Sequence, residues 1–203
     1  YRSVNASTMM YLIPFWVALP VLSYSLTYII TKPVYPPRRG NFWIYEKFVN
    51  KQVLLKRFVV VANCYNAFSV GTNNVANVAG PFMVGTQFSL SQLLFIFALF
   101  YGLGSLVFFA PMKTASEEIV PLGLFTASII SLVSGTLMIA ASYFGVPQSF
   151  VMLKMGAIFA ISSIKHGAGV TFSNPLTQKT LYTWTVNPLI TLVISYGLMM
   201  ILK

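Results

Sequence analysis

The residues best suited to bind a small ion lie in one polar interruption of a very apolar sequence. Gly71, Thr72, Asn73 and Asn74 follow one another, and Asn77 comes one helical turn after Asn73. An amide binds a cation through its oxygen and an anion through its N–H groups, and a buried amide needs such partners. We therefore predict a substrate- or ion-binding site at these five residues. The alternative is a polar helix break whose amides are satisfied by backbone groups and hold no ligand.

A second polar group follows Pro147. Gln148 and Ser149 could hydrogen-bond an anion, or could cap a helix that begins there. Lys154 lies in an apolar run, where a charge is costly if that run enters a membrane. It is either a fixed cation beside an anion site or a long side chain that reaches the lipid headgroups. We include all three polar residues in the predicted site.

The sequence offers little for catalysis. It has no aspartate, and its acids are Glu46, Glu117 and Glu118. Its one histidine, His166, is expected in a loop, with a role in proton coupling as the alternative. The single Cys64 excludes an internal disulfide and is expected to be a small buried residue. With no acid–base–nucleophile group to argue from spacing, we predict a protein that is not an enzyme and has no metal or cofactor.

The composition indicates an integral membrane protein. Of the 203 residues, 57% are hydrophobic and 8% are charged, whereas soluble domains carry about 25% charged residues. Apolar runs of membrane-spanning length predict an all-α, multi-pass transmembrane bundle in the cell membrane. The predicted spans are 9–31, 89–110, 122–145 and 181–202, with a shorter apolar stretch at 145–163 and a polar loop at 165–179.

Positive charge is concentrated in one linker. Seven of the 13 basic residues lie between positions 32 and 57: Lys32, Arg38, Arg39, Lys47, Lys51, Lys56 and Arg57. Such a cluster beside a membrane span predicts a cytoplasmic loop, here with an interfacial helix around Phe42–Lys51. A specific nucleic-acid or lipid-binding patch is the alternative; we expect the lipid bilayer as surroundings and no nucleic-acid partner.

Two apolar stretches are expected to be broken or re-entrant helices. Glycine, asparagine and proline interrupt 58–87, and Gly145-Val146-Pro147 opens 146–164. Transporters build midplane substrate sites from such discontinuous helices. In the span 122–145, the small residues Gly123, Ala127, Ser131 and Gly135 recur every four positions and predict close helix packing. We divide the chain into a span at 1–31, a basic linker at 32–57 and a motif-bearing unit at 58–203.

The run Gly71-Thr72-Asn73-Asn74-Val75-Ala76-Asn77-Val78, followed by Gly80-Pro81, resembles the signature of the PiT family of inorganic phosphate transporters, Gly-Ala-Asn-Asp-Val-Ala-Asn-Ala. Three further landmarks keep the family's order. Glu117–Leu122 resembles its charged segment, Tyr143–Pro147 its aromatic-Gly-x-Pro turn, and Trp184–Pro188 the start of its last helix. The resemblance covers roughly residues 50–203. This region is similar to the second of the family's two inverted repeats.

The resemblance implies secondary transport of inorganic phosphate, coupled to sodium or protons, through a site between two repeats. This chain would then be one half of an inverted-repeat transporter, partnered by an N-terminal repeat or a second chain, and a homodimer is compatible with it. The same features also fit a degenerate half that serves as a structural subunit without transport of its own.

Two departures from the family pattern concern charge. Asn74 stands where the family has an aspartate, and Lys154 appears where the second element has no lysine. Ser149 is retained, but the threonines and histidine of the family's Pro-x-Ser-Thr-Thr-His are absent. We therefore expect weak sodium dependence, because a neutral amide attracts a cation less than a carboxylate does, while Lys154 supplies positive charge to the anion.

Overall fold

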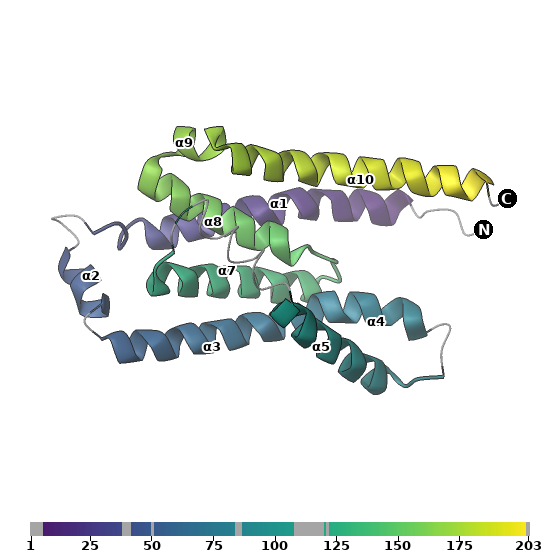
Figure 1. Ribbon diagram of the computed structural model, residues 1–203, viewed down its shortest axis with the longest axis horizontal. Helices are drawn as coiled ribbons and strands as arrows, with labels where there is room; N and C mark the ends of the chain where they lie inside the picture. The colour runs from purple at the N-terminus through teal and green to yellow at the C-terminus, as the bar shows by residue number, and fades with distance from the viewer. Residues whose placement is uncertain are drawn as a thin grey trace.

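The computed structural model describes residues 6–37, 42–49, 51–83, 87–107, 120 and 122–201. The regular elements in these ranges are all helices, as predicted (Figure 1). They are α1 (Ala6–Thr31), α2 (Phe42–Val49), α3 (Gln52–Val70), the π-helix η1 (Gly71–Val75), α4 (Ala76–Met83), α5 (Leu90–Val107), α7 (Leu124–Tyr143), α8 (Phe150–His166), α9 (Ala168–Ser173) and α10 (Pro175–Ile201).

Four helical stretches of the described chain are long and apolar enough to cross a membrane: Ser7–Thr31, Gln52–Met83, Leu90–Val107 and Leu124–Tyr143. Three of them coincide with predicted spans, and the fourth contains the asparagine-rich segment. The described part of the last predicted span, 181–201, lies within α10, a helix of 27 residues. The prediction of an all-α, multi-pass membrane bundle is confirmed.

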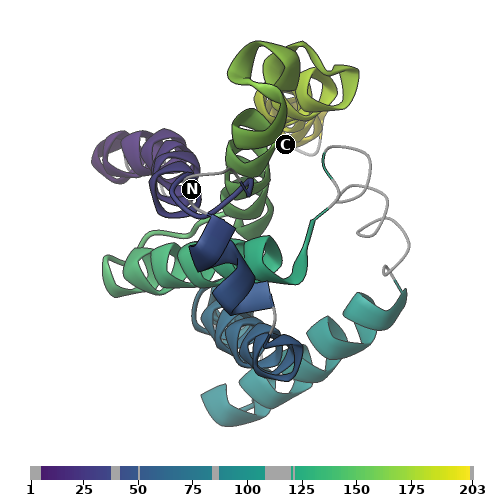
Figure 2. The same cartoon turned by 90° about the vertical axis from the view of Figure 1, so that its left-hand side faces the viewer.

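Helix α7 lies at the centre of the bundle. It packs on α3 along one side and on α1 and α8 along the other, an arrangement visible end-on in Figure 2. Leu19 of α1, Leu137 and Met138 of α7, and Leu153 of α8 form one apolar core there. Most side chains of α7 are therefore buried inside the protein, whereas most side chains of α5 are exposed.

The interface between α3 and α7 combines small residues with polar contacts. A Cβ atom on Gly135 would lie 3.0 Å from the Tyr65 ring, so the two helices approach closely there. Ser131 Oγ donates a hydrogen bond of 2.8 Å to Asn63 Oδ1, and the Tyr65 and Thr136 hydroxyls lie 3.1 Å apart. The predicted packing role of the small-residue stripe is confirmed at Ser131 and Gly135.

Helices α1 and α8 approach even more closely, at Gly156. A Cβ atom on this glycine would lie 2.7 Å from the Pro20 carbonyl oxygen of α1, which is a backbone atom that cannot rotate away. Nearby, Ser23 Oγ donates to the Leu153 carbonyl oxygen at 2.7 Å. This contact between backbones requires glycine at position 156.

We predict that Gly156→Ala lowers the free energy of unfolding by about 1–3 kcal/mol, because the added methyl group forces α1 and α8 apart. Thermal unfolding in detergent, followed by far-UV circular dichroism, measures the effect. Gly197→Ala in α10 is the matched control, because a Cβ atom there meets nothing within 4 Å. Equal melting temperatures for the two variants would contradict the close approach.

The expected interruption near Gly71 is present, but its form differs from the prediction. The chain stays helical from Gln52 to Met83, with helical dihedral angles at Val70, Gly71 and Ala76. Residues Gly71–Val75 form a π-helical turn. The predicted unwound or re-entrant backbone at 58–87 is therefore wrong.

Two hydroxyl side chains, one just before the π-turn and one within it, explain the irregular geometry. Ser69 Oγ donates to the Asn66 carbonyl at 2.6 Å, and Thr72 Oγ1 donates to the Ser69 carbonyl at 2.8 Å. Such hydroxyls compete with backbone N–H groups for helix carbonyls and bend or widen the helix locally. Gly71, which has low helix propensity, adds to this tendency. A π-bulge keeps the backbone bonded where an unwound segment would not.

Two other expectations need correction. Helix α8 runs unbroken from Phe150 to His166, so the element predicted at 146–164 is a turn followed by a regular helix. The polar stretch 165–179 is mainly helical, because Asn174 Oδ1 accepts from the Leu176 N–H at 2.8 Å and Pro175 begins α10. Pro188 consequently lies inside α10, and His166 ends α8.

The remaining predictions divide between those that the described residues address and those that they do not. Cys64 is exposed, so its expected burial is wrong. Helix α2 matches the expected interfacial helix, and α3 begins at Gln52, within the predicted linker. Lys113, Glu117 and Glu118, with Arg38 and Arg39, lie outside the described residues. The division at 31 and 57, and the cytoplasmic side of the linker, stay predictions.

Candidate functional site

A groove lies between α3, η1, α5 and α8. Its volume is about 830 Å³, and its walls are mostly apolar. Asn66 and Gly71 line it from the α3–η1 side, Tyr101 lines it from α5, and Asn74 and Lys154 add an amide and an ammonium group. An apolar hollow with a few convergent polar groups is the usual form of a small-ligand site.

Lys154 contributes the positive charge of this groove. The side chain is half-buried, and its Nζ lies 5.4 Å from the centre of the Phe150 ring. In the described part of the chain it has no carboxylate partner. Lys154 lines the same groove as Asn74. A half-buried, unpaired ammonium among apolar residues attracts an anion strongly, because low polarity strengthens the attraction between charges.

Asn73 belongs to a different environment from its neighbour Asn74. It is buried, and its Nδ2 donates to Ser142 Oγ at 3.1 Å and to the Val146 carbonyl at 2.9 Å. Its Oδ1 accepts from the Gln148 backbone N–H at 3.0 Å and from Asn77 Nδ2 at 3.1 Å. The side chain of Asn73 is thus fully hydrogen-bonded and joins the π-turn to the segment between α7 and α8.

That segment is itself a defined turn. Helix α7 ends with Gly145 at φ +65°, and the Val146 and Gly145 N–H groups donate to the carbonyls of Ala141 and Ser142 at 2.8 and 3.0 Å. This is a Schellman motif, which explains the need for glycine. Trp16 of α1 donates from Nε1 to the Pro147 carbonyl at 2.7 Å. Helices α1 and α7 and the π-turn all fix the position at which α8 begins.

Of the other predicted site residues, Thr72 and Asn77 lie beside Asn73, and Ser149 lies at the start of α8. Thr72 Oγ1 bonds to the Ser69 carbonyl and lies 3.3 Å from Ser142 Oγ, and Asn77 supports Asn73. Ser149 is exposed and caps α8, accepting from the Met152 N–H at 3.4 Å. Of the eight predicted residues, only Gly71, Asn74 and Lys154 line the groove.

The Gln148 side chain belongs neither to the groove nor to the hydrogen-bonded group around Asn73. Its side chain is 4% exposed, and neither its Oε1 nor its Nε2 has a hydrogen-bond partner among the described residues. A buried amide left in this state is costly, and such groups usually have a partner. Both amide atoms are closed off from the surroundings, and the side chain does not line the groove.

Sequence reasoning missed Ser142 and the contribution of α5. Ser142 receives the Asn73 bond and donates to the Met138 carbonyl at 3.0 Å. The four-residue spacing of the small-residue stripe continues to Ile139 and Tyr143, so that pattern did not mark Ser142. No pattern in the apolar run of α5 marked Tyr101 or Gly104 as groove residues, because their role depends on tertiary packing alone.

Comparison with known proteins decides the family. The sequence model of the phosphate transporter family matches residues 1–195. The chain belongs to this family. It is 28% identical over 197 residues to a sulfate permease of Bacillus subtilis, covering 97% of this chain and 54% of the permease. It is 23% identical over 186 residues to a putative phosphate permease of Methanocaldococcus jannaschii, covering 89% of this chain and 56% of that protein.

A third relative is the chloroplastic inorganic phosphate transporter 2-1 of Arabidopsis thaliana, 24% identical over 156 residues, with 72% of this chain and 26% of that protein covered. No solved structure gives a significant match. As a member of the phosphate transporter family, the chain is a multi-pass membrane protein whose relatives are permeases and transporters rather than enzymes. It spans about half the length of the first two relatives.

Proposed function

We propose that this chain forms half of a secondary transporter for a tetrahedral oxyanion, phosphate or sulfate. The groove lined by Asn74 and Lys154 is its half of the anion path. The relatives include permeases named for each of these two anions, and the two ions share the geometry and negative charge that an ammonium and an amide would bind.

One observation carries the proposal: the two residues that depart in charge from the family pattern line the same groove. The neutral Asn74 attracts a cation less than the family's aspartate, and the ammonium of Lys154 attracts an anion directly. A fixed cation would reduce the need for a sodium ion beside the substrate. We therefore propose an anion site with weak sodium coupling, completed by a second repeat in the same or another chain.

The exposed apolar face of α5 is where such a second half would meet this one, because an apolar face of this kind requires lipid or protein cover. The second half would be an N-terminal repeat, a separate chain or a second copy in a homodimer.

A second candidate function is a structural half without transport of its own. It is favoured by the hydrogen bonds of Thr72, Asn73 and Asn77, which join parts of the protein to one another and not to the groove. In this case the asparagine-rich segment maintains a scaffold, and the other half would hold the whole substrate site.

Uptake by proteoliposomes distinguishes the two functions. Radiolabelled phosphate and sulfate would be offered to vesicles that contain this chain alone, and to vesicles that also contain an N-terminal family repeat. Saturable uptake of either anion that requires this chain supports the proposal. If the N-terminal repeat transports equally well without this chain, the structural function holds and the groove is not an anion path.

The proposal also predicts the effect of restoring the acid. Asn74→Asp should raise the sodium stimulation of uptake about tenfold or more, because opposite charges about 4 Å apart attract by about 4 kcal/mol at an effective dielectric constant near 20, and about 1.4 kcal/mol already corresponds to a factor of ten. The effect should be largest with Lys154→Met in the same protein, since the ammonium then no longer competes with sodium. Initial rates at several sodium concentrations test this.

Asn74→Gln is the matched control, because it keeps a neutral amide at the same position. Its sodium dependence should equal that of the unchanged protein. If Asn74→Asp and Asn74→Gln respond equally to sodium, position 74 does not face the coupling ion, and the proposed reason for weak coupling is wrong.

A further inference from the structure

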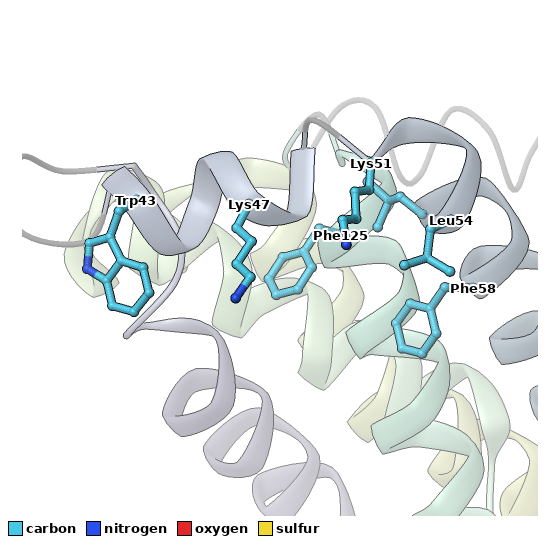
Figure 3. A pocket seen from close by; sticks show the side chains of 7 residues that line it. Trp43, Lys47, Lys51, Leu54, Phe58 and Phe125 are labelled. Atoms are coloured by element: carbon cyan, nitrogen blue, oxygen red, sulfur yellow. The ribbon is translucent and has the colours of Figure 1, made fainter.

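A separate cavity of about 540 Å³ lies where α2, α3 and α7 meet. Trp43 and Lys47 line it from α2, Lys51 precedes α3, Leu54 and Phe58 come from α3, and Phe125 comes from α7 (Figure 3). On α3, positions 54 and 58 are one helical turn apart and share one face. The cavity shares no lining residue with the Asn74–Lys154 groove.

Two lysines lie between the apolar residues on the two sides of this cavity, with Trp43 on the α2 side and Leu54 and Phe58 on the α3 side (Figure 3). The side chains of Lys47 and Lys51 extend from the backbone toward the hollow in Figure 3. Arg57 lines a shallower adjoining hollow together with Lys51 and Leu54. Glu46, the neighbouring acid on α2, does not line the cavity. An anionic group placed here would meet two lysines and, beside them, an arginine.

The apolar residues on both sides of the lysines are open to the surroundings: Trp43, Leu54 and Phe58 are 65%, 61% and 40% exposed. Lys51 immediately precedes the helical stretch Gln52–Met83, which is long and apolar enough to cross a membrane, and a lysine at the end of such a helix can reach the lipid headgroups. Phe58 is seven residues further on, about 10 Å along an α-helix. The α3 side of the lining therefore changes from cationic to apolar over this length.

We propose that this cavity binds one anionic phospholipid, with its phosphate between Lys47 and Lys51 and an acyl chain along Leu54, Phe58 and Phe125. Basic pockets beside membrane helices bind anionic headgroups in this way. The apolar wall favours a lipid over a soluble phosphate compound, because a soluble compound would leave Phe58 and Leu54 uncovered. Binding here does not depend on the proposed transport function.

The experiment measures lipid retention on the purified full chain. In detergent, phosphatidylglycerol and phosphatidylcholine of equal acyl length compete for the protein, and native mass spectrometry counts the molecules retained. Lys47→Gln/Lys51→Gln is expected to weaken phosphatidylglycerol retention about tenfold and leave phosphatidylcholine unchanged. The matched control is Lys165→Gln/Lys179→Gln, which changes two exposed lysines outside the cavity.

Two further measurements identify the molecule that binds in the cavity. Phe58→Ser should weaken the retention of phosphatidylglycerol, and glycerol phosphate at the same concentration should not displace it. If glycerol phosphate displaces the lipid fully, the site binds a soluble anion and the proposal is overturned. The proposal also fails if the two lysine pairs have equal effects, since retention would then reflect overall positive charge.

Discussion

Lys154→Met should reduce oxyanion uptake by about tenfold or more, measured in whichever of the two proteoliposome preparations takes up the anion. The variant should be at least as stable as the unchanged protein. The ammonium lines the groove with no carboxylate partner in the described part of the chain. Its removal therefore takes away attraction for a dianion but no ion pair. An unpaired charge among apolar groups costs free energy in the folded state, and a methionine of similar shape avoids that cost. Initial uptake rates and thermal unfolding in detergent measure the two effects separately.

Two controls sharpen this prediction. Lys154→Arg keeps the charge and should retain more uptake than Lys154→Met. Lys165→Met removes an exposed lysine from the last turn of the same helix and should change uptake little. If Lys154→Met transports like the unchanged protein, the anion path does not pass this lysine. A large loss of stability would instead indicate a partner for the ammonium in a part of the protein not described.

Asn73→Leu should lower the free energy of unfolding by at least about 2 kcal/mol. Four hydrogen bonds end on this side chain. Leucine fills a similar volume but leaves the buried Gln148 N–H and Val146 carbonyl without partners, and each such group costs about 1–3 kcal/mol. Chemical or thermal denaturation in detergent gives the change in stability. Uptake should fall as well, because the start of α8 and hence the position of Lys154 depend on this contact.

The adjacent residue supplies the control. Asn74 has no side-chain hydrogen bond among the described residues and lines the groove, so Asn74→Leu should leave stability nearly unchanged. Two neighbouring asparagines are thus expected to differ, with position 73 acting through stability and position 74 through ion dependence. Similar losses of stability in both variants would show that the hydrogen-bond network around Asn73 is not what maintains the turn.

The sequence could indicate that this pair of asparagines matters, but not that their roles differ. Composition and apolar run length were sufficient for the all-α membrane bundle, because a bilayer leaves helices as nearly the only solution for such segments. The direction of each side chain around Gly71–Val75 depends on the extra residue in the π-turn. That in turn depends on how Ser69 and Thr72 hydroxyls compete for carbonyls, a balance that residue spacing does not reveal.

Helix ends were predicted less well than helix centres. Glycine and proline in the segment 71–81 were interpreted as a break, although the flanking apolar sequence and the contact with α7 keep the chain helical. Conversely, the polar residues of 165–179 were interpreted as a loop, although Asn174 and Pro175 form a good helix start. In both cases tertiary packing or a local cap outweighed the average polarity of the segment.

The π-turn also determines in which direction the side chains of α4, the helical segment that follows it, point around the helix axis. A π-helical turn holds one more residue than an α-helical turn, and one residue corresponds to about 100° of rotation. In the present phase Ala79 is fully buried, and the rings of Phe82 and Phe97 of α5 lie 5.2 Å apart. Deleting one residue from Gly71–Val75 would restore a regular helix and turn α4 away from α5. The number of residues in this turn, as well as their identity, therefore determines which face of α4 meets α5.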